Sequence, residues 1–145
     1  MTALQLCYLA AGVFFTIGLL SGIWKYWGIV QSEKAEAHEY VSVLHRAALM
    51  YSFASILLAK FVELNPYSEQ VKFYAVAAVV GFFAFAQTTY FIHAILKDTD
   101  NQFRKPYVIG GWKFPPFLLH LSMFLLIAAE LGGFLVLFWG YVSSL

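Results

Sequence analysis

Four long runs of hydrophobic residues alternate with shorter polar connectors along this chain. A bilayer core needs about 20 mainly apolar residues per helix, and each run meets that length. The runs extend over Leu4–Trp24, Tyr40–Phe61, Phe73–Leu96 and Pro115–Tyr141. The pattern predicts an all-α integral membrane protein, in which four antiparallel transmembrane helices form a bundle and residues 1–145 make a single domain.

The polar residues within these runs fall mostly on one stripe of each helix, at alternating steps of three and four residues. Such stripes are expected to face other helices rather than lipid. In chain order the stripes contain Ala11, Phe15, Gly18, Gly22 and Lys25; His38, Ser42, His45, Leu49, Ser52, Ile56 and Ala59; Ala75, Val79, Phe82, Ala86, Thr89 and His93; and His120, Met123, Ile127, Glu130, Phe134, Leu137 and Tyr141. Gly18 and Gly22 form a GxxxG pattern, which predicts either close packing inside the bundle or a dimer contact.

The polar connectors contain residues that predict where helices start and stop. The run Glu33–Ala37 favours helix, and we expect it to begin the second helix before the membrane does. Asn65-Pro66 predicts a break in the chain. Asp98–Gln102 is acidic but lacks the spaced ligands of a calcium loop, so it is interpreted as a helix stop and a solvated turn.

Basic residues are distributed unequally between the two ends of the predicted bundle. One end has only Lys60 and Lys72, whereas the other has Lys25, Lys34, Arg46, Lys97, Arg104, Lys105 and Lys113. The positive-inside rule places the richer end in the cytoplasm of a multi-pass protein of the inner (plasma) membrane, with both termini on the non-cytoplasmic side. No Lys or Arg precedes the first run, so we expect that run to be a retained helix rather than a signal peptide.

Composition excludes several function classes. Charged residues make up 12% of the chain and the net charge is +1, so bulk attraction to nucleic acid is not expected. The single cysteine, Cys7, excludes an internal disulfide and a CxxC pair. Membrane quinone-thiol oxidoreductases that cycle paired cysteines are therefore excluded.

Three histidines, His45, His93 and His120, lie on three different predicted helices at similar depth, each roughly 6–8 Å from the cytoplasmic end. Neutral imidazoles bind haem iron and transition metals. The layer predicts a haem b or metal site with all three as candidate ligands, in which Arg46, Arg104 and Lys105 pair with haem propionates or another anionic ligand. The alternative for each histidine is a hydrogen bond to a carbonyl, a lipid headgroup or water.

Glu130 lies near the middle of the fourth predicted helix, with no charged residue within one helical turn. An ionised carboxylate is expensive in hydrocarbon, so this residue is expected to be protonated or bonded to neighbours. Ser52 and Gln87 lie at similar depth. The set predicts either a proton relay or a hydrogen-bonded clamp between helices.

These observations support three functional hypotheses, and no catalytic residue is assigned. The first is a small membrane protein that binds a b-type haem or a metal ion for electron transfer or redox chemistry, alone, as a homo-oligomer or in a larger membrane complex. The second is a lipid- or small-molecule-binding membrane enzyme. Size and four-span layout are similar to those of the membrane-associated proteins of eicosanoid and glutathione metabolism, although their arginine- and asparagine-bearing motif does not occur between His38 and Phe61. The third is a structural or accessory subunit without chemistry.

Overall fold

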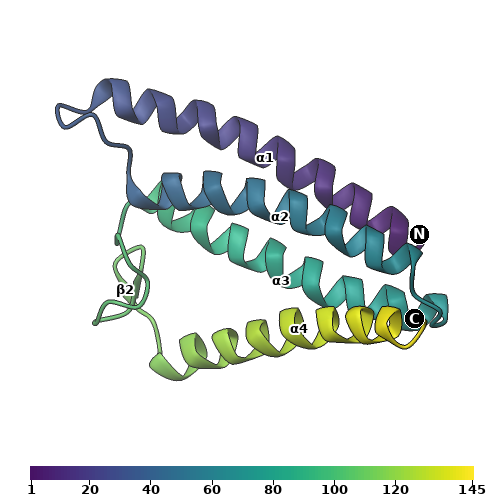
Figure 1. The fold of residues 1–145 in the computed structure, drawn as a ribbon. Coiled ribbons are helices and arrows are strands. Elements are labelled where there is room, and N and C mark those ends of the chain that lie inside the picture. The colour runs from purple at the N-terminus through teal and green to yellow at the C-terminus, as the bar shows by residue number, and fades with distance from the viewer.

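The computed structural model describes residues 1–145 and is all-helical apart from one short hairpin. Its elements are α1 (Ala3–Gln31), α2 (Glu39–Glu63), α3 (Glu69–Leu96), β1 (Val108–Ile109), β2 (Trp112–Lys113) and α4 (Pro116–Val142). All four helices are long and apolar enough to cross a membrane, which indicates a multi-pass membrane protein. Both chain termini lie at one end of the molecule and the hairpin lies at the other, as Figure 1 shows.

Local signals fix where the helices begin. Thr2 forms a capping box with Gln5 at the start of α1, and the Ser68 side chain accepts a hydrogen bond from the backbone of α3. Pro116 opens α4, where its missing N–H costs nothing. The sequence prediction of one helix in each apolar run is confirmed, and every helix extends past at least one predicted boundary.

The connector between α1 and α2 is a turn rather than the expected helical start of α2. Ala35 has a φ of 53°, in the left-handed region that interrupts a right-handed helix. Helix α2 begins only at Glu39, where the His38 ring accepts a hydrogen bond from the Tyr40 N–H. The prediction that Glu33–Ala37 starts the second helix is wrong, because the chain turns within this segment to bring α2 against α1.

Two glycines allow α1 and α2 to pack closely. A Cβ on Gly18 would lie 2.6 Å from Leu49 Cδ2, and a Cβ on Gly22 would lie 2.9 Å from His45 Cε1. Both distances are too short for real contacts, so α2 occupies the space that side chains would need. The GxxxG pattern therefore serves packing inside the bundle, as one of its two interpretations predicted.

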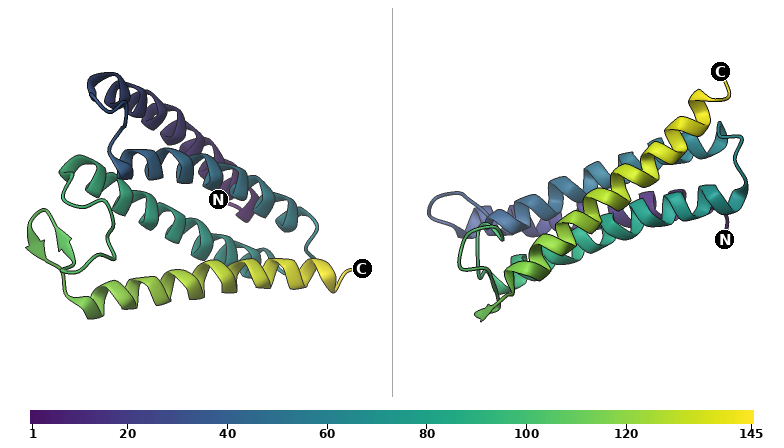
Figure 2. Two further views of the ribbon diagram at one scale, coloured as in Figure 1. Left: turned by 60° about the vertical axis from the view of Figure 1, so that its left-hand side comes forward. Right: turned by 90° about the horizontal axis from the view of Figure 1, so that it is seen from below.

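Helix α4 is the least buried of the four. Only 11% of the residues in its most hydrophobic window are buried, against 33% in each of the other helices. It lies along α3, where Gly133 faces Ala75, and its separation from α1 is widest at the end of the molecule that carries the hairpin (Figure 2). Near the C-terminal end of α4, the Leu137 carbonyl accepts a hydrogen bond from the Asn65 amide at 2.7 Å. The Asn65-Pro66 break thus also anchors α4 to the rest of the bundle.

The segment between α3 and α4 folds into a hairpin that is tied to the helix ends. Gly110 and Gly111 form its turn with φ values of 58° and 85°, as a two-residue type I′ turn requires. The Gln102 N–H donates to the Tyr40 hydroxyl of α2 at 2.6 Å. This docked segment forms one wall of the candidate site.

Candidate functional site

A buried histidine–aspartate pair lies where α3 meets the hairpin segment. His93 is in the last turn of α3, and Asp98 follows the left-handed Lys97 that ends the helix. His93 Nδ1 lies 2.7 Å from Asp98 Oδ1, and the two side chains are only 3% and 7% exposed. The interpretation of Asp98 as part of a solvated turn is wrong, because Lys97 turns the chain so that Asp98 returns to the helix end.

Asp98 also holds the hairpin in place. Its Oδ2 accepts a hydrogen bond from the Gly110 N–H at 2.6 Å, so one carboxylate joins α3 to the hairpin turn. Burial opposes its ionisation, but the hydrogen bonds from His93 and from the Gly110 N–H outweigh burial, and the pKa of Asp98 lies below its ordinary value of 3.8. The carboxylate is therefore ionised near neutral pH.

An ionised Asp98 determines which His93 nitrogen carries the proton. Nδ1–H donates to the carboxylate, and neutral imidazole then presents an unprotonated Nε2 that can accept a hydrogen bond. The ring also packs against Tyr40, with ring centroids 4.8 Å apart. The pair therefore has a fixed orientation, and the only hydrogen bond of the His93 ring within the protein is made through Nδ1, not Nε2.

His93 lines a cavity of about 260 Å³ between α3, α4 and the hairpin segment. Its polar lining residues are Thr88, Thr89, His93, Gln102 and Ser122, and its other walls are mostly hydrophobic side chains such as Phe85, Ile92, Tyr107, Phe114 and Met123. The cavity therefore combines an apolar body with a small set of polar groups, as ligand sites in proteins commonly do.

These polar groups offer mainly hydrogen-bond acceptors to the cavity. The hydroxyls of Thr88, Thr89 and Ser122 donate to backbone carbonyls of their own helices, at 2.8, 3.1 and 2.8 Å, which leaves their oxygen lone pairs free. Gln102 Oε1 is buried without a partner. Together with His93 Nε2, these atoms form an acceptor cluster that a hydrogen-bond donor can satisfy.

The other two histidines lie apart from this cluster. His45 Nδ1 is 2.8 Å from the Gly18 carbonyl at the α1–α2 contact, a bond that is compatible with both predictions for this residue. His120 is exposed at the start of α4 and contacts Tyr107, with ring centroids 6.0 Å apart. No group of three His, Cys, Asp or Glu side chains is arranged to hold a metal ion. The haem or metal site stays a prediction.

The basic residues predicted to hold an anionic ligand do not converge. Arg46 pairs with Glu39 at 3.2 Å, and Arg104 pairs with Asp100 at 2.8 Å, both at exposed positions. Lys105 instead lines a separate depression of about 340 Å³. Two of the three cations therefore already have carboxylate partners.

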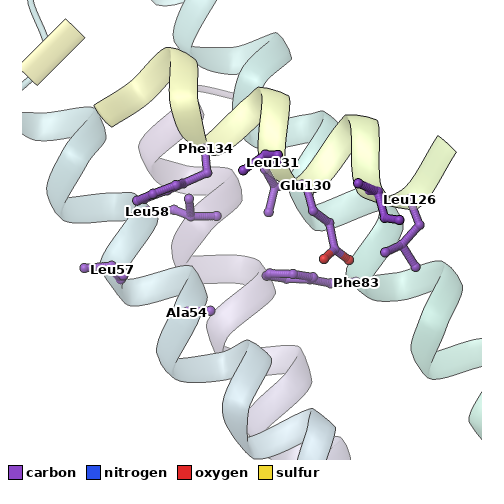
Figure 3. Close-up of a pocket in the computed structure, with 10 residues that line it drawn as sticks. Ala54, Leu57, Leu58, Phe83, Leu126, Glu130, Leu131 and Phe134 are labelled. Carbon is purple, nitrogen blue, oxygen red and sulfur yellow. The ribbon is translucent and has the colours of Figure 1, made fainter. Parts of the chain in front are cut away.

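Glu130 faces an apolar groove between α2, α3 and α4, and its carboxyl points toward Phe83 (Figure 3). Its Oε1 is buried without a hydrogen-bond partner. Ser52 donates to the Leu49 carbonyl, and Gln87 lines a different cavity, between α1 and α3. The structure therefore does not join the three residues of the predicted relay or clamp by hydrogen bonds.

Asp98 and Gln102 were not among the site residues predicted from the sequence, since both lie in a segment interpreted as a turn. One signal for Asp98 was present: it is a carboxylate just beyond a helix end, one and a half turns after a histidine. Gln102 gives no comparable signal, because only the fold brings the hairpin segment against α2.

No protein family model matches this chain, and neither a curated protein nor a solved structure matches it. The assignment of function therefore depends on the chemistry of the site itself.

Proposed function

We propose that this protein spans the inner (plasma) membrane as an antiparallel four-helix bundle and binds a small amphiphile that carries a hydrogen-bond-donating head group. The cavity beside His93 holds the head group. The hairpin segment faces the cytoplasm and both termini face the opposite compartment, as the distribution of basic residues favours.

The acceptor cluster is the main observation that supports this proposal. A buried acceptor without a partner, such as Gln102 Oε1, costs about 1–3 kcal/mol, and a bound donor removes that cost. A hydroxyl or phenolic head group provides such donors. An anion provides no hydrogen for Gln102 Oε1 or for His93 Nε2.

The cavity walls favour an apolar body on the same ligand. At about 260 Å³ the cavity is slightly smaller than the roughly 300–1,000 Å³ of common ligand sites, so it suits a compact head group. The wall residues Phe85 and Ile92 are 43% and 39% exposed on the outside of the bundle, where lipid chains would lie. A hydrocarbon tail can extend there into the bilayer.

The His93–Asp98 pair provides a hydrogen-bond acceptor and a base within the site. His93 Nε2 can accept a hydrogen bond from the head group and can act as a general base, because the bond from Nδ1 to Asp98 fixes the orientation of the ring. This arrangement binds a hydroxyl and can activate it.

Mass spectrometry of molecules that co-purify with the protein tests the proposal. The wild-type protein is expected to retain an amphiphile, and its amount should fall about tenfold in Ser122→Phe, which fills the cavity, and in His93→Ala, which removes an acceptor. The matched control, His120→Ala, replaces an exposed histidine and should retain it. Equal amounts in all four proteins would contradict the proposal.

A b-type haem or a transition-metal ion for electron transfer is a second proposal. It is supported by the Nδ1 bonds of His45 and His93 to oxygen atoms, because metal-binding histidines commonly make such a bond while Nε2 coordinates. A Soret band lost in His93→Ala would support it, and colourless, metal-free protein after expression with adequate haem and iron would contradict it. If replacing all three histidines changes neither bound molecules nor stability, the accessory-subunit hypothesis is favoured.

A further inference from the structure

The groove around Glu130 is separate from the cavity beside His93. It has a volume of about 420 Å³, and every lining residue except Glu130 is hydrophobic. Ala54, Leu57 and Leu58 of α2 form one wall, and Figure 3 shows Phe83 of α3 opposite the carboxyl. The groove thus surrounds a single carboxyl group with hydrocarbon.

No side chain of the protein neutralises this carboxyl. The α3 residues in the groove, Val79 and Phe83, have no titratable group. On α2, the Tyr51 hydroxyl makes no hydrogen bond to Glu130 Oε1. A charged carboxylate without a partner is expensive in hydrocarbon, so Glu130 needs either a proton or a cation from outside the chain.

A second copy of the chain does not provide that cation. Each of the nine Lys and Arg residues lies in a connector or within about two turns of a helix end. Glu130 is near the middle of α4, so no basic side chain of a neighbouring copy lies at its depth. A cation that pairs with this carboxyl in place of the proton therefore comes from a molecule that enters the groove.

We propose that the Glu130 groove binds a hydrophobic amine, with its ammonium group on the carboxylate and its hydrocarbon body against Leu58, Phe83 and Phe134. Charge complementarity selects the ammonium, and the apolar walls select the hydrocarbon. When the ammonium form binds to the protonated carboxyl, the carboxyl releases one proton to the aqueous phase, and no covalent bond forms. The amine and a proton therefore compete for the same oxygen atoms.

Binding of 1-adamantylamine tests the proposal, with 1-adamantanol as the matched neutral probe. The full chain is placed in phosphatidylcholine nanodiscs, and saturable binding of each radiolabelled probe is measured. We expect the amine to bind about tenfold more tightly than the alcohol, because one charge-assisted hydrogen bond is lost in the alcohol. The affinity for the amine should weaken as the pH is lowered, since protons compete for Glu130.

Glu130→Gln keeps the shape of the side chain and removes its charge, so it should abolish the preference for the amine. Glu36→Gln is the matched control, because Glu36 is exposed in the α1–α2 connector and the change in net charge is the same. Ala54→Phe fills the groove and leaves Glu130 intact, so it should weaken binding even if Glu130→Gln fails to fold.

Three outcomes would overturn the proposal. The first is equal affinity for the amine in the wild-type protein and in Glu130→Gln, or in the wild-type protein and in Ala54→Phe. The second is equal binding of amine and alcohol, which would make the groove a purely apolar surface. The third is a wild-type dimer that binds no amine and becomes monomeric in Glu130→Gln, which would make the groove a contact between copies.

Discussion

A single residue, Asp98, controls both the chemistry and the shape of the candidate site. One carboxylate oxygen accepts from His93, and the other accepts from the backbone of the hairpin turn at Gly110. Because the pair is buried, water does not compete strongly for these bonds. The orientation of His93 and the position of the cavity wall therefore depend on the same side chain.

Replacing Asp98 with Asn should destabilise the docked hairpin by about 1–3 kcal/mol, because the charge-assisted hydrogen bonds are lost. Thermal unfolding in detergent and limited proteolysis of residues 97–115 measure the effect. The control is Asp100→Asn, which breaks an exposed pair with Arg104 that is worth about 0–1 kcal/mol. Equal proteolysis of the two variants would show that Asp98 does not hold the hairpin.

The same carboxylate predicts an acid limit for this segment. Since the pKa of Asp98 is lowered in the folded protein, its contribution to stability is complete above the ordinary value of 3.8 and is lost as the pH falls below it through the folded-state pKa. Hydrogen exchange at Gly110 as a function of pH measures this loss. The acid-dependent increase should be absent in Asp98→Asn, and its persistence there would assign it to another group.

For single residues, the sequence predicted the position along each helix but not the groups that surround the side chain. The depth of His93 and of Glu130 follows from counting residues along a helix. Their surroundings do not, because the His93–Asp98 bond depends on the left-handed Lys97, and the Glu130 groove depends on how far α4 lies from α2. Neither the turn at Lys97 nor the separation of α4 from α2 is encoded in the periodicity of a single helix.

Among the elements, α1 and α2 form the most constrained contact. The His45 ring lies in the space beside Gly22 and bonds to the Gly18 carbonyl, so both glycines and the histidine form one interface. A methyl group at Gly22 would meet the ring of His45 rather than a flexible chain end. The ring must then move and lose its hydrogen bond.

Gly22→Ala should therefore destabilise the protein by about 1–3 kcal/mol through overpacking. Gly12→Ala is the matched control in the same helix, because no atom lies within 4 Å of the added Cβ. Higher helix propensity should leave that variant unchanged or more stable by up to about 1 kcal/mol. Thermal unfolding of the two variants distinguishes the effects, and a tolerated Gly22→Ala would mean that the interface is looser than described.

The helices themselves were predictable because long apolar runs and end signals are local properties of the sequence. The connector at Glu33–Ala37 was predicted wrongly for the opposite reason. Its residues favour helix, but the turn that brings α2 against α1 places Ala35 in the left-handed region. Tertiary packing outweighs a local preference of a few tenths of a kcal/mol per residue.

For the whole molecule, the unequal distribution of basic residues predicts orientation. A membrane-impermeant maleimide applied to intact spheroplasts should label Ser144→Cys near the C-terminus but not Asn101→Cys in the hairpin segment until the membrane is opened. Both positions are exposed, and the native Cys7 is buried, so the parent protein is the unlabelled control. Labelling of Asn101→Cys alone in intact spheroplasts would reverse the proposed orientation.

The grouping of the candidate site residues was the least predictable feature of the whole molecule. The sequence suggested one polar layer at one end of the bundle, whereas the structure divides it into separate places: His45 between α1 and α2, His93 beside the hairpin, and His120 on the outside of α4. Arg46 and Arg104 have nearby acidic partners. Equal depth is therefore a poor guide to proximity when four helices of different tilt are involved.

In the proposed function, His93 presents an unprotonated Nε2 to a ligand with a hydrogen-bond donor. Nitrogen-15 NMR of histidine-labelled protein in lipid measures the protonation of this atom, with the His93 signal assigned by its loss in His93→Gln. In ligand-free protein at a pH where the ring is neutral, we predict a proton on Nδ1 and none on Nε2, and the co-purified amphiphile should shift the Nε2 resonance. A proton found on Nε2 of neutral His93, or an Nε2 signal that the amphiphile leaves unchanged, would contradict the proposed function.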